Sequence, residues 1–212
     1  PEFIALGSVI RDMLFPDMLL IGESDSRAGD MLESVYRTTV ECKPHVYRMN
    51  FVNAELCKIS VNTSVTTKIS YANMIADMCD QIPGADAMVV TQAVGADSRI
   101  GQKYLKPAIG YGGPCFPRDN KAFAALGRTL NVNCSLAEST DEINEYQVTR
   151  IERIVTDLAA SASRIFIMGL SYKPYTSVIE QSQAIFVATR LSDLGFIVSV
   201  YDPEANQNAR NI

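Results

Sequence analysis

Short apolar stretches of strand length occur near both ends of the chain. They lie at residues 17–24 (DMLLIGES), 164–169 (RIFIMG) and 197–203 (IVSVYDP). Their length and their flanking Asp, Gly and Pro residues are typical of buried strands. A helical pattern follows the first stretch at 26–40, and another at 182–196 separates the last two. The strand–helix–strand order at the end predicts a βαβ unit of a parallel sheet.

The middle of the chain shows a different pattern, with no glycine or proline between Asn53 and Gln81. Many β-branched residues there, such as Val61 and Thr66, lower the helix propensity. A strand of roughly thirty residues would nevertheless be far longer than strands usually are. We therefore predict one long helix over 53–81. Further helical patterns lie at 84–95, 119–131 and 136–160.

Composition limits the class of protein. The 212 residues are 47% hydrophobic and 20% charged, as in an ordinary soluble protein of one or two domains. A net charge of -5 argues against a general nucleic-acid surface. No apolar run approaches the ~20 residues of a membrane span. The opening PEFIALGSVIRDM does not resemble a signal peptide, and it lacks an initial Met, so we expect a piece of a longer protein.

The five cysteines exclude several kinds of site. They are odd in number and form no C-x-x-C pair, so they predict neither a disulfide framework nor a zinc site. His45 is the single histidine, which leaves no metal partner and no Cys–His or Ser–His catalytic pair. We expect no metal, a reducing cytoplasmic location, and proton transfer by Lys, Asp, Glu or water.

Cys115 stands between a glycine-rich segment and a helix, in GYGGPCFPRDN at 110–120. Pro117 suits the first helical position, which would place Cys115 at a helix N-terminus, where free N–H groups favour a thiolate. Arg118 adds positive charge, and Gly112 lets the backbone approach a ligand. These residues alone leave open the alternative of a buried structural cysteine beside a glycine turn.

Two further groups of polar residues carry candidate chemistry. Lys58 and Asn62 lie four residues apart on the predicted long helix, in line with apolar positions that face inward. A lysine whose ammonium reaches solvent from the helix edge is the alternative. Arg99, Lys103 and Lys106 surround Tyr104 just before the glycines, which suggests a phosphate site or a solvated charge run.

In this order, these groups resemble the nucleotide-sugar dehydrogenases of the UDP-glucose/GDP-mannose dehydrogenase family. GYGGPCFPRD is similar to the family's G-x-G-G-x-C-F-P-K-D motif, and ELCKISVN to its central-helix Lys and Asn pattern. PEFIALG resembles the end of its first domain, and IMGLSYKPYT the start of its last. The resemblance implies an α/β fold. Its parts are the tail end of an N-terminal NAD-binding Rossmann domain (1–42), a helical central dimerisation domain with the catalytic Cys (43–160), and a partial Rossmann-like βαβ domain for the nucleotide sugar (161–212).

The family also implies a role for each matching residue. Cys115 would be the nucleophile, Lys58 and Asn62 the polar pair beside it, Asp119 the acid after it, and Glu2 the glutamate that acts through water. Substrate-binding roles fall on Phe3, Arg99 (from a neighbouring subunit), Tyr104, Lys106, Tyr111, Gly112, Tyr172 and Lys173.

The reaction that the resemblance implies uses NAD to oxidise the C6 alcohol of a UDP-sugar, UDP-glucose above all. The aldehyde is captured by Cys115 as a thiohemiacetal, oxidised to a thioester and hydrolysed to the uronic acid. Lys58 and Asn62 would stabilise the oxyanions. The long helix would form a homodimer.

Three departures from the family pattern qualify this expectation. The G-x-G-x-x-G fingerprint is missing, so we expect the chain as given to bind NAD poorly. Leu6 stands where a second glutamate is usual, and Glu180 where an arginine meets the NAD pyrophosphate. Two alternatives remain: a thiolate acyltransferase or hydrolase without NAD, and a non-catalytic dimerising module that binds nucleotide sugars.

Overall fold

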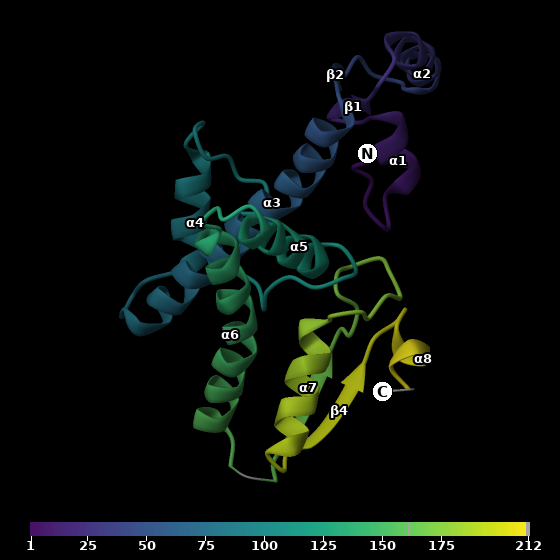
Figure 1. Ribbon diagram of the computed structural model, residues 1–212. Helices are drawn as coiled ribbons and strands as arrows, with labels where there is room; N and C mark the ends of the chain where they lie inside the picture. Colours follow the sequence, from purple (N-terminus) through teal and green to yellow (C-terminus); the bar gives the residue numbers. More distant parts are fainter. Residues whose placement is uncertain (161, 211–212) are drawn as a thin grey trace. The chain divides into compact units, whose positions relative to one another are not determined.

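The structure, a computed structural model, describes residues 1–160 and 162–210 (Figure 1). The chain folds as two compact units, Pro1–Val61 and Asn62–Ile212. The long helix α3, Phe51–Gln81, belongs in part to each. Ser161 and Ile212, the limits of the predicted last domain, lie outside the described residues, and the three predicted domain ranges stay predictions.

The first unit contains one strand–helix–strand unit. The predicted strand is confirmed as β1, Met18–Gly22, and the helix after it as α2, Ser26–Thr39. A second strand, β2 (His45–Met49), pairs with β1 in parallel, with Met18 opposite His45. Neither β2 nor the short helix α1, Val9–Leu14, was predicted from the sequence. Three consecutive side chains of β1 form the buried centre: Leu19, Leu20 and Ile21.

Arg48 on β2 fastens the start of α2 to the sheet. Its Nε donates to Glu23 Oε2 (2.9 Å), its Nη2 donates to the Ser26 carbonyl (2.7 Å), and its Nη1 bonds Asp30. The hydrogen bonds of Asp30 and Glu23 raise the pKa of Arg48. A substituent on Gly29 would lie 1.5 Å from Glu23 Oε2, so this ion-pair network requires glycine there.

Four helices make up the first part of the second unit: the rest of α3, α4 (Ala87–Ala96), α5 (Phe116–Thr129) and α6 (Ser135–Leu158). All four predicted helices are confirmed. α5 begins at Phe116, one residue before the predicted first position, so Pro117 occupies its second position. α5 packs along α6.

Buried polar side chains join these helices. Thr66 is fully buried, and its Oγ1 donates to the Thr63 carbonyl of its own helix (2.9 Å). It also lies 3.2 Å from Asn120 Oδ1 on α5. Ser70 Oγ donates to the Thr140 carbonyl on α6 (2.9 Å). Because buried hydroxyls find partners in this way, the β-branched threonines of α3 fit within a long helix.

The end of the chain forms the predicted βαβ unit. β3 (Arg164–Met168) and β4 (Ile197–Tyr201) pair in parallel, and α7 (Gln183–Asp193) connects them. Figure 1 shows α7 beside β4 and α6, and the three elements share an apolar core around Val187, Leu191 and Phe196. A short helix that the sequence did not predict, α8 (Asn206–Ala209), follows.

Helices with small parallel sheets confirm the predicted α/β class. Across the part of the chain that the structure describes, none of the helices has the length and apolar character needed to cross a bilayer.

Candidate active site

Cys115 is exposed and stands immediately before the first residue of α5, as the N-cap. Its carbonyl accepts the N–H of Asp119 (2.8 Å), which is the first hydrogen bond of the helix. The side chain therefore lies where the free N–H groups and the positive end of the helix dipole favour a negative charge. The exposure also excludes the alternative of a buried structural cysteine.

Asp119, one turn into α5, holds Asn62 of α3. Its Oδ2 accepts a hydrogen bond from Asn62 Nδ2 (2.6 Å), and its Oδ1 accepts one from Arg118 Nε (2.9 Å). Asp119 is only 7% exposed and Asn62 only 8%. A charge-assisted bond in such surroundings fixes the orientation of the amide. The helix that follows Cys115 thus also sets the orientation of the Asn62 amide.

Arg118 brings positive charge to the same place. Its Nη2 lies 2.9 Å from Asp119 Oδ1, while most of its side chain is exposed. The hydrogen bond and charge of Asp119 raise the pKa of Arg118, and Cys115 raises it further. The guanidinium therefore lies close to both groups, so a thiolate at Cys115 would have a cation beside it.

The glycines before Cys115 pack against residues 172–181. A Cβ at Gly112 would lie 2.1 Å from the Gln181 carbonyl oxygen, and one at Gly113 would lie 2.5 Å from the Tyr172 ring. The Gly113 N–H donates to the Glu180 carbonyl (2.9 Å). The need for glycine here thus comes from close packing within the chain, while ligand contact by Gly112 stays a prediction.

Tyr172 brings the last part of the chain to the Cys115 loop. Burial raises the pKa of Tyr172, and the charge of Cys115 raises it further. Lys173 Nζ lies 5.6 Å from the centre of the Tyr172 ring. These two predicted substrate-binding residues are therefore neighbours, and the first lies near the thiol.

Asp202 holds the segment that carries Tyr172, and sequence reasoning missed it. Its carboxylate accepts the N–H groups of Leu170 (2.6 Å) and Ser171 (2.9 Å) on one side, and those of Glu204 and Ala205 (both 2.8 Å) on the other. Burial acts to raise the pKa of Asp202, but these backbone bonds outweigh it and hold the pKa below the usual range. The sequence signal that could have identified Asp202 is its position at the end of a predicted strand, directly before Pro203.

Tyr111 is 4% exposed, and its polar groups are bonded within the chain. Its hydroxyl donates to Asp141 (2.5 Å), and its backbone pairs with the Asn144 side chain. Burial, followed by the bond to Asp141, raises the pKa of Tyr111. These contacts support a structural role, and its predicted substrate contact stays untested.

Three predicted residues meet in the first unit. Lys58 Nζ donates to the Glu2 carbonyl (2.5 Å) and lies 4.8 Å from the centre of the Phe3 ring. Glu2 Oε2 accepts the N–H of Ile4 (2.9 Å). The Lys58 ammonium is thus engaged with the chain, which counts against a lysine that merely reaches for solvent.

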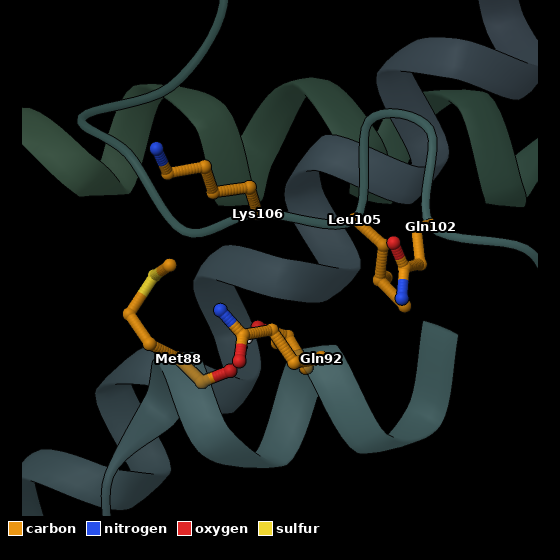
Figure 2. A pocket seen from close by; sticks show the side chains of 6 residues that line it. Met88, Gln92, Gln102, Leu105 and Lys106 are labelled. Atoms are coloured by element: carbon orange, nitrogen blue, oxygen red, sulfur yellow. Dashed lines mark hydrogen bonds between the residues drawn. The ribbon is translucent and has the colours of Figure 1, made fainter. Parts of the chain in front are cut away.

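The basic loop before the glycines is exposed. The Arg99 side chain is 86% exposed and pairs with Asp97 (2.6 Å), which raises the pKa of Arg99. Tyr104 is exposed with a φ of 64°. Figure 2 shows Lys106 at a pocket between this loop and α4, whose lining residues are Met88, Thr91, Gln92, Gln102, Leu105 and Lys106. The neighbours of Lys106 are therefore α4 and its own loop.

The turn after β1 does not fit a dinucleotide phosphate. It reads Gly22-Glu23-Ser24-Asp25, and the Asp25 carboxylate caps α2 by accepting the Arg27 N–H (3.0 Å). That carboxylate takes the place that a phosphate occupies at a helix N-terminus. In the second unit, Glu180 precedes α7 and is exposed. Among residues 1–160 and 162–210, no group of three or more His, Cys, Asp or Glu side chains is arranged for a metal ion.

Comparison with known families identifies the class of protein. Residues 52–146 match the central domain of the UDP-glucose/GDP-mannose dehydrogenase family, and residues 166–212 match the family's UDP binding domain. Together the two matches cover more than half of the chain. The chain belongs to the UDP-glucose/GDP-mannose dehydrogenase family, as its motifs indicated.

Individual relatives are similar along the whole chain. UDP-glucose 6-dehydrogenase TuaD of Bacillus subtilis is 35% identical over 214 residues, covering 100% of this chain and 46% of the relative. UDP-glucose 6-dehydrogenase of Rhizobium meliloti is also 35% identical, with 100% and 49% covered. The solved structure of a UDP-glucose dehydrogenase from Pyrobaculum islandicum superposes with a TM-score of 0.94 at 32% identity, with 100% and 49% covered. The chain spans about half the length of the curated relatives it matches.

Proposed function

We propose that the protein containing this chain is a nucleotide-sugar dehydrogenase that oxidises the C6 alcohol of UDP-glucose to the uronic acid, with Cys115 as the nucleophile. One observation carries the proposal: the exposed Cys115 is the N-cap of α5, and Asp119 of that helix fixes Asn62. The similarity to UDP-glucose 6-dehydrogenases supports the choice of sugar.

The overall change removes four electrons from C6. The alcohol is oxidised to an aldehyde, and the Cys115 thiolate adds to the carbonyl carbon to form a thiohemiacetal. Oxidation of this adduct gives a thioester, and water cleaves the C–S bond to release the carboxylate and the thiolate. NAD, when bound, supplies the oxidising power, with each of two NAD molecules accepting one hydride. The turn after β1 does not fit the NAD phosphates, so the roles below concern the thiol and the oxygen at C6.

Asn62 and Lys58 would stabilise negative oxygen at C6. One N–H of the Asn62 amide is bonded to Asp119, which leaves the other for the substrate oxygen. The Lys58 ammonium supplies the second donor. Asp119 accepts hydrogen bonds at both oxygens, which favours an orienting role over proton transfer. Glu2, whose carbonyl holds Lys58, would act through the hydrolytic water.

The other predicted residues would bind the UDP-sugar. Tyr172 and Lys173 would cover the nucleotide, while Phe3 and the Gly112 backbone would contact the sugar, with Tyr104, Lys106 and Tyr111 nearby. We propose a homodimer through α3, in which Arg99 reaches the site of the neighbouring subunit. Its exposure supports this role. The five free cysteines support a reducing compartment, the cytoplasm.

The stoichiometry of NADH formation tests the proposal. With a limiting amount of UDP-glucose and excess NAD, the protein that contains this chain should form two NADH per sugar. Cys115→Ala should abolish uronate formation, whereas Cys42→Ala, a control far from the motif in sequence, should not. One NADH per sugar, or uronate formed at the parent rate by Cys115→Ala, contradicts the mechanism.

Mixing two inactive variants tests the dimer. Arg99→Ala subunits keep the Cys115 thiol, and Cys115→Ala subunits keep Arg99. In a mixed dimer, one of the two sites therefore combines the thiol of the first subunit with the arginine of the second. Random reassortment of a two-fold dimer then restores about a quarter of the activity. No recovery after subunit exchange, shown with tagged subunits, argues against the action of Arg99 across the dimer.

A non-catalytic module is the second candidate, because Glu180 and Leu6 depart from the family motifs. Both are exposed. Calorimetric titration with UDP-glucose, combined with an assay for NADH, distinguishes this module from the enzyme. A binding module binds UDP-glucose but forms no NADH at any NAD concentration.

A further inference from the structure

The loop that leads to Cys115 is clamped by a side chain of α6. The Tyr111 N–H donates to Asn144 Oδ1 (2.7 Å), and Asn144 Nδ2 donates to the Tyr111 carbonyl (3.0 Å). This is the paired exchange that two antiparallel strands make, here between a side-chain amide and one residue of backbone. Asn144 is 6% exposed, so water hardly competes for these bonds.

Two neighbouring features are built around this clamp. Gly110 has a φ of 127°, and a Cβ there would lie 2.4 Å from Asn144 Oδ1. Only a glycine allows the loop to come this close. Gln183, the first residue of α7, donates from Nε2 to the same Tyr111 carbonyl (3.0 Å). The Tyr111 peptide is therefore tied to α6 and to the start of α7.

The clamp reaches Cys115 through the Tyr111 side chain. The Tyr111 ring packs edge to face with Phe116, at 6.4 Å between centroids and 84° between planes. Phe116 follows Cys115 and opens α5. Residues on both sides of the thiol are thus fixed relative to α6, on which Asn144 lies.

We propose that Asn144 is a positioning residue for the Cys115 thiol, with Gln183 as a second tie to the same carbonyl. This inference rests on the proposed role of Cys115 as the nucleophile. Asn144 acts through the Tyr111 backbone and makes no contact with the substrate. Its loss leaves the Tyr111 N–H without a partner and the Tyr111 carbonyl with the Gln183 bond alone, so the loop loosens and the thiol loses its fixed orientation at the start of α5. The thiol then loses the environment that favours a thiolate.

Alkylation of Cys115 tests this without sugar or NAD. The full chain is treated with iodoacetamide, and the labelling rate of the Cys115 peptide is followed by mass spectrometry against that of Cys42. We expect Asn144→Ala to lower the Cys115 rate about fivefold. Gln147→Ala is the matched control, because Gln147 is buried on the same helix but donates to Ile143 within α6. It should leave the Cys115 rate unchanged.

Two less disruptive substitutions test the positioning role of Asn144 if Asn144→Ala does not fold. Asn144→Asp keeps the acceptor for the Tyr111 N–H and loses the donor, and Gln183→Ala removes only the second tie. Each should slow labelling to a lesser extent. Unchanged labelling in every folded variant, or an equal loss in Gln147→Ala, overturns the inference.

Turnover adds a separate readout. Asn144→Ala should lower kcat far more than it raises the KM for UDP-glucose, whereas general loosening of the site would change both. If the unmutated protein forms no uronate while the labelling effect is present, the proposed function fails and the positioning role of Asn144 stands.

Discussion

Two adjacent loops of the second unit are built in different ways. In the loop at 97–109, the Arg99 side chain is mostly exposed, and two side chains of α3, Lys68 and Asn73, hold the backbone. In the loop at 110–115, the backbone is bonded to the Asn144 side chain and to the Glu180 carbonyl. Both backbones are held, but the first loop exposes charge, whereas the glycines of the second pack closely against residues 172–181.

The difference indicates how each loop would serve a reaction. Exposed cations suit a loop that meets an anion or another subunit, because they can reorient on contact. A nucleophile instead needs a fixed position, and close packing of glycines with buried hydrogen bonds provides it. Substitutions in the two loops should therefore have unequal effects on stability.

The largest effect is expected from a single methyl group at Gly112. Gly112→Ala places a Cβ 2.1 Å from the Gln181 carbonyl oxygen, and backbone on both sides must shift. We expect a loss of about 3 kcal/mol in the free energy of unfolding, measured in urea. In the exposed loop, Gly101→Ala meets open space and is strained only by its φ of 75°, so about 1 kcal/mol is expected. Equal losses would remove the contrast between the loops.

The second prediction compares two aspartates. Asp119→Ala leaves the buried Asn62 amide without its partner, which should cost about 2 kcal/mol in unfolding free energy. Asp97→Ala breaks an exposed pair with Arg99 and should leave the urea midpoint unchanged. A larger loss from Asp97→Ala than from Asp119→Ala contradicts the assignment of the fixed loop.

The third prediction concerns acid. The pKa of Asp202 in the folded state lies below its unfolded value of about 3.9, so its contribution to stability is complete above about pH 5. That contribution is lost as the pH falls toward the folded pKa. The advantage of the parent over Asp202→Asn should therefore be about 1 to 2 kcal/mol smaller at pH 3 than at pH 6, in urea unfolding at both values. A constant difference contradicts the role of the four backbone bonds.

Among the substitutions expected to change stability, Lys68→Met should have the smallest effect. Lys68 Nζ donates to the carbonyls of Ile100 (3.1 Å) and Gly101 (3.0 Å), in a partly exposed position. Lys68→Met should lower the free energy of unfolding by about 0.5 kcal/mol and leave Cys115 labelling unchanged. Slower labelling would show that the two loops are coupled.

Local signals in the sequence predicted most of the secondary structure. The absence of glycine and proline was enough to predict α3 despite its β-branched residues, and the spacing of short apolar runs predicted β3, α7 and β4. β2 was missed because the five residues HVYRM are of mixed polarity without a clear alternation, which gives a weak signal without the partner strand β1.

The partners of the loop could not be predicted, because they are distant in sequence. Gly112 suggested a ligand, but the atom it approaches belongs to Gln181, and Tyr111 is held by Asn144 and Gln183. Nothing in the local sequence of those residues marks them as neighbours of Cys115. The motif predicts the chemistry of the site, while the support of the site depends on tertiary packing that the motif does not encode.

The central claim is that Cys115 carries the substrate covalently. Acid quenching during turnover with UDP-glucose and NAD, followed by peptide mapping, tests it most directly. The account predicts a UDP-glucuronyl thioester on the peptide that contains Cys115, which hydroxylamine removes. Uronate formation with no adduct at Cys115, or with the adduct on another cysteine, would contradict it.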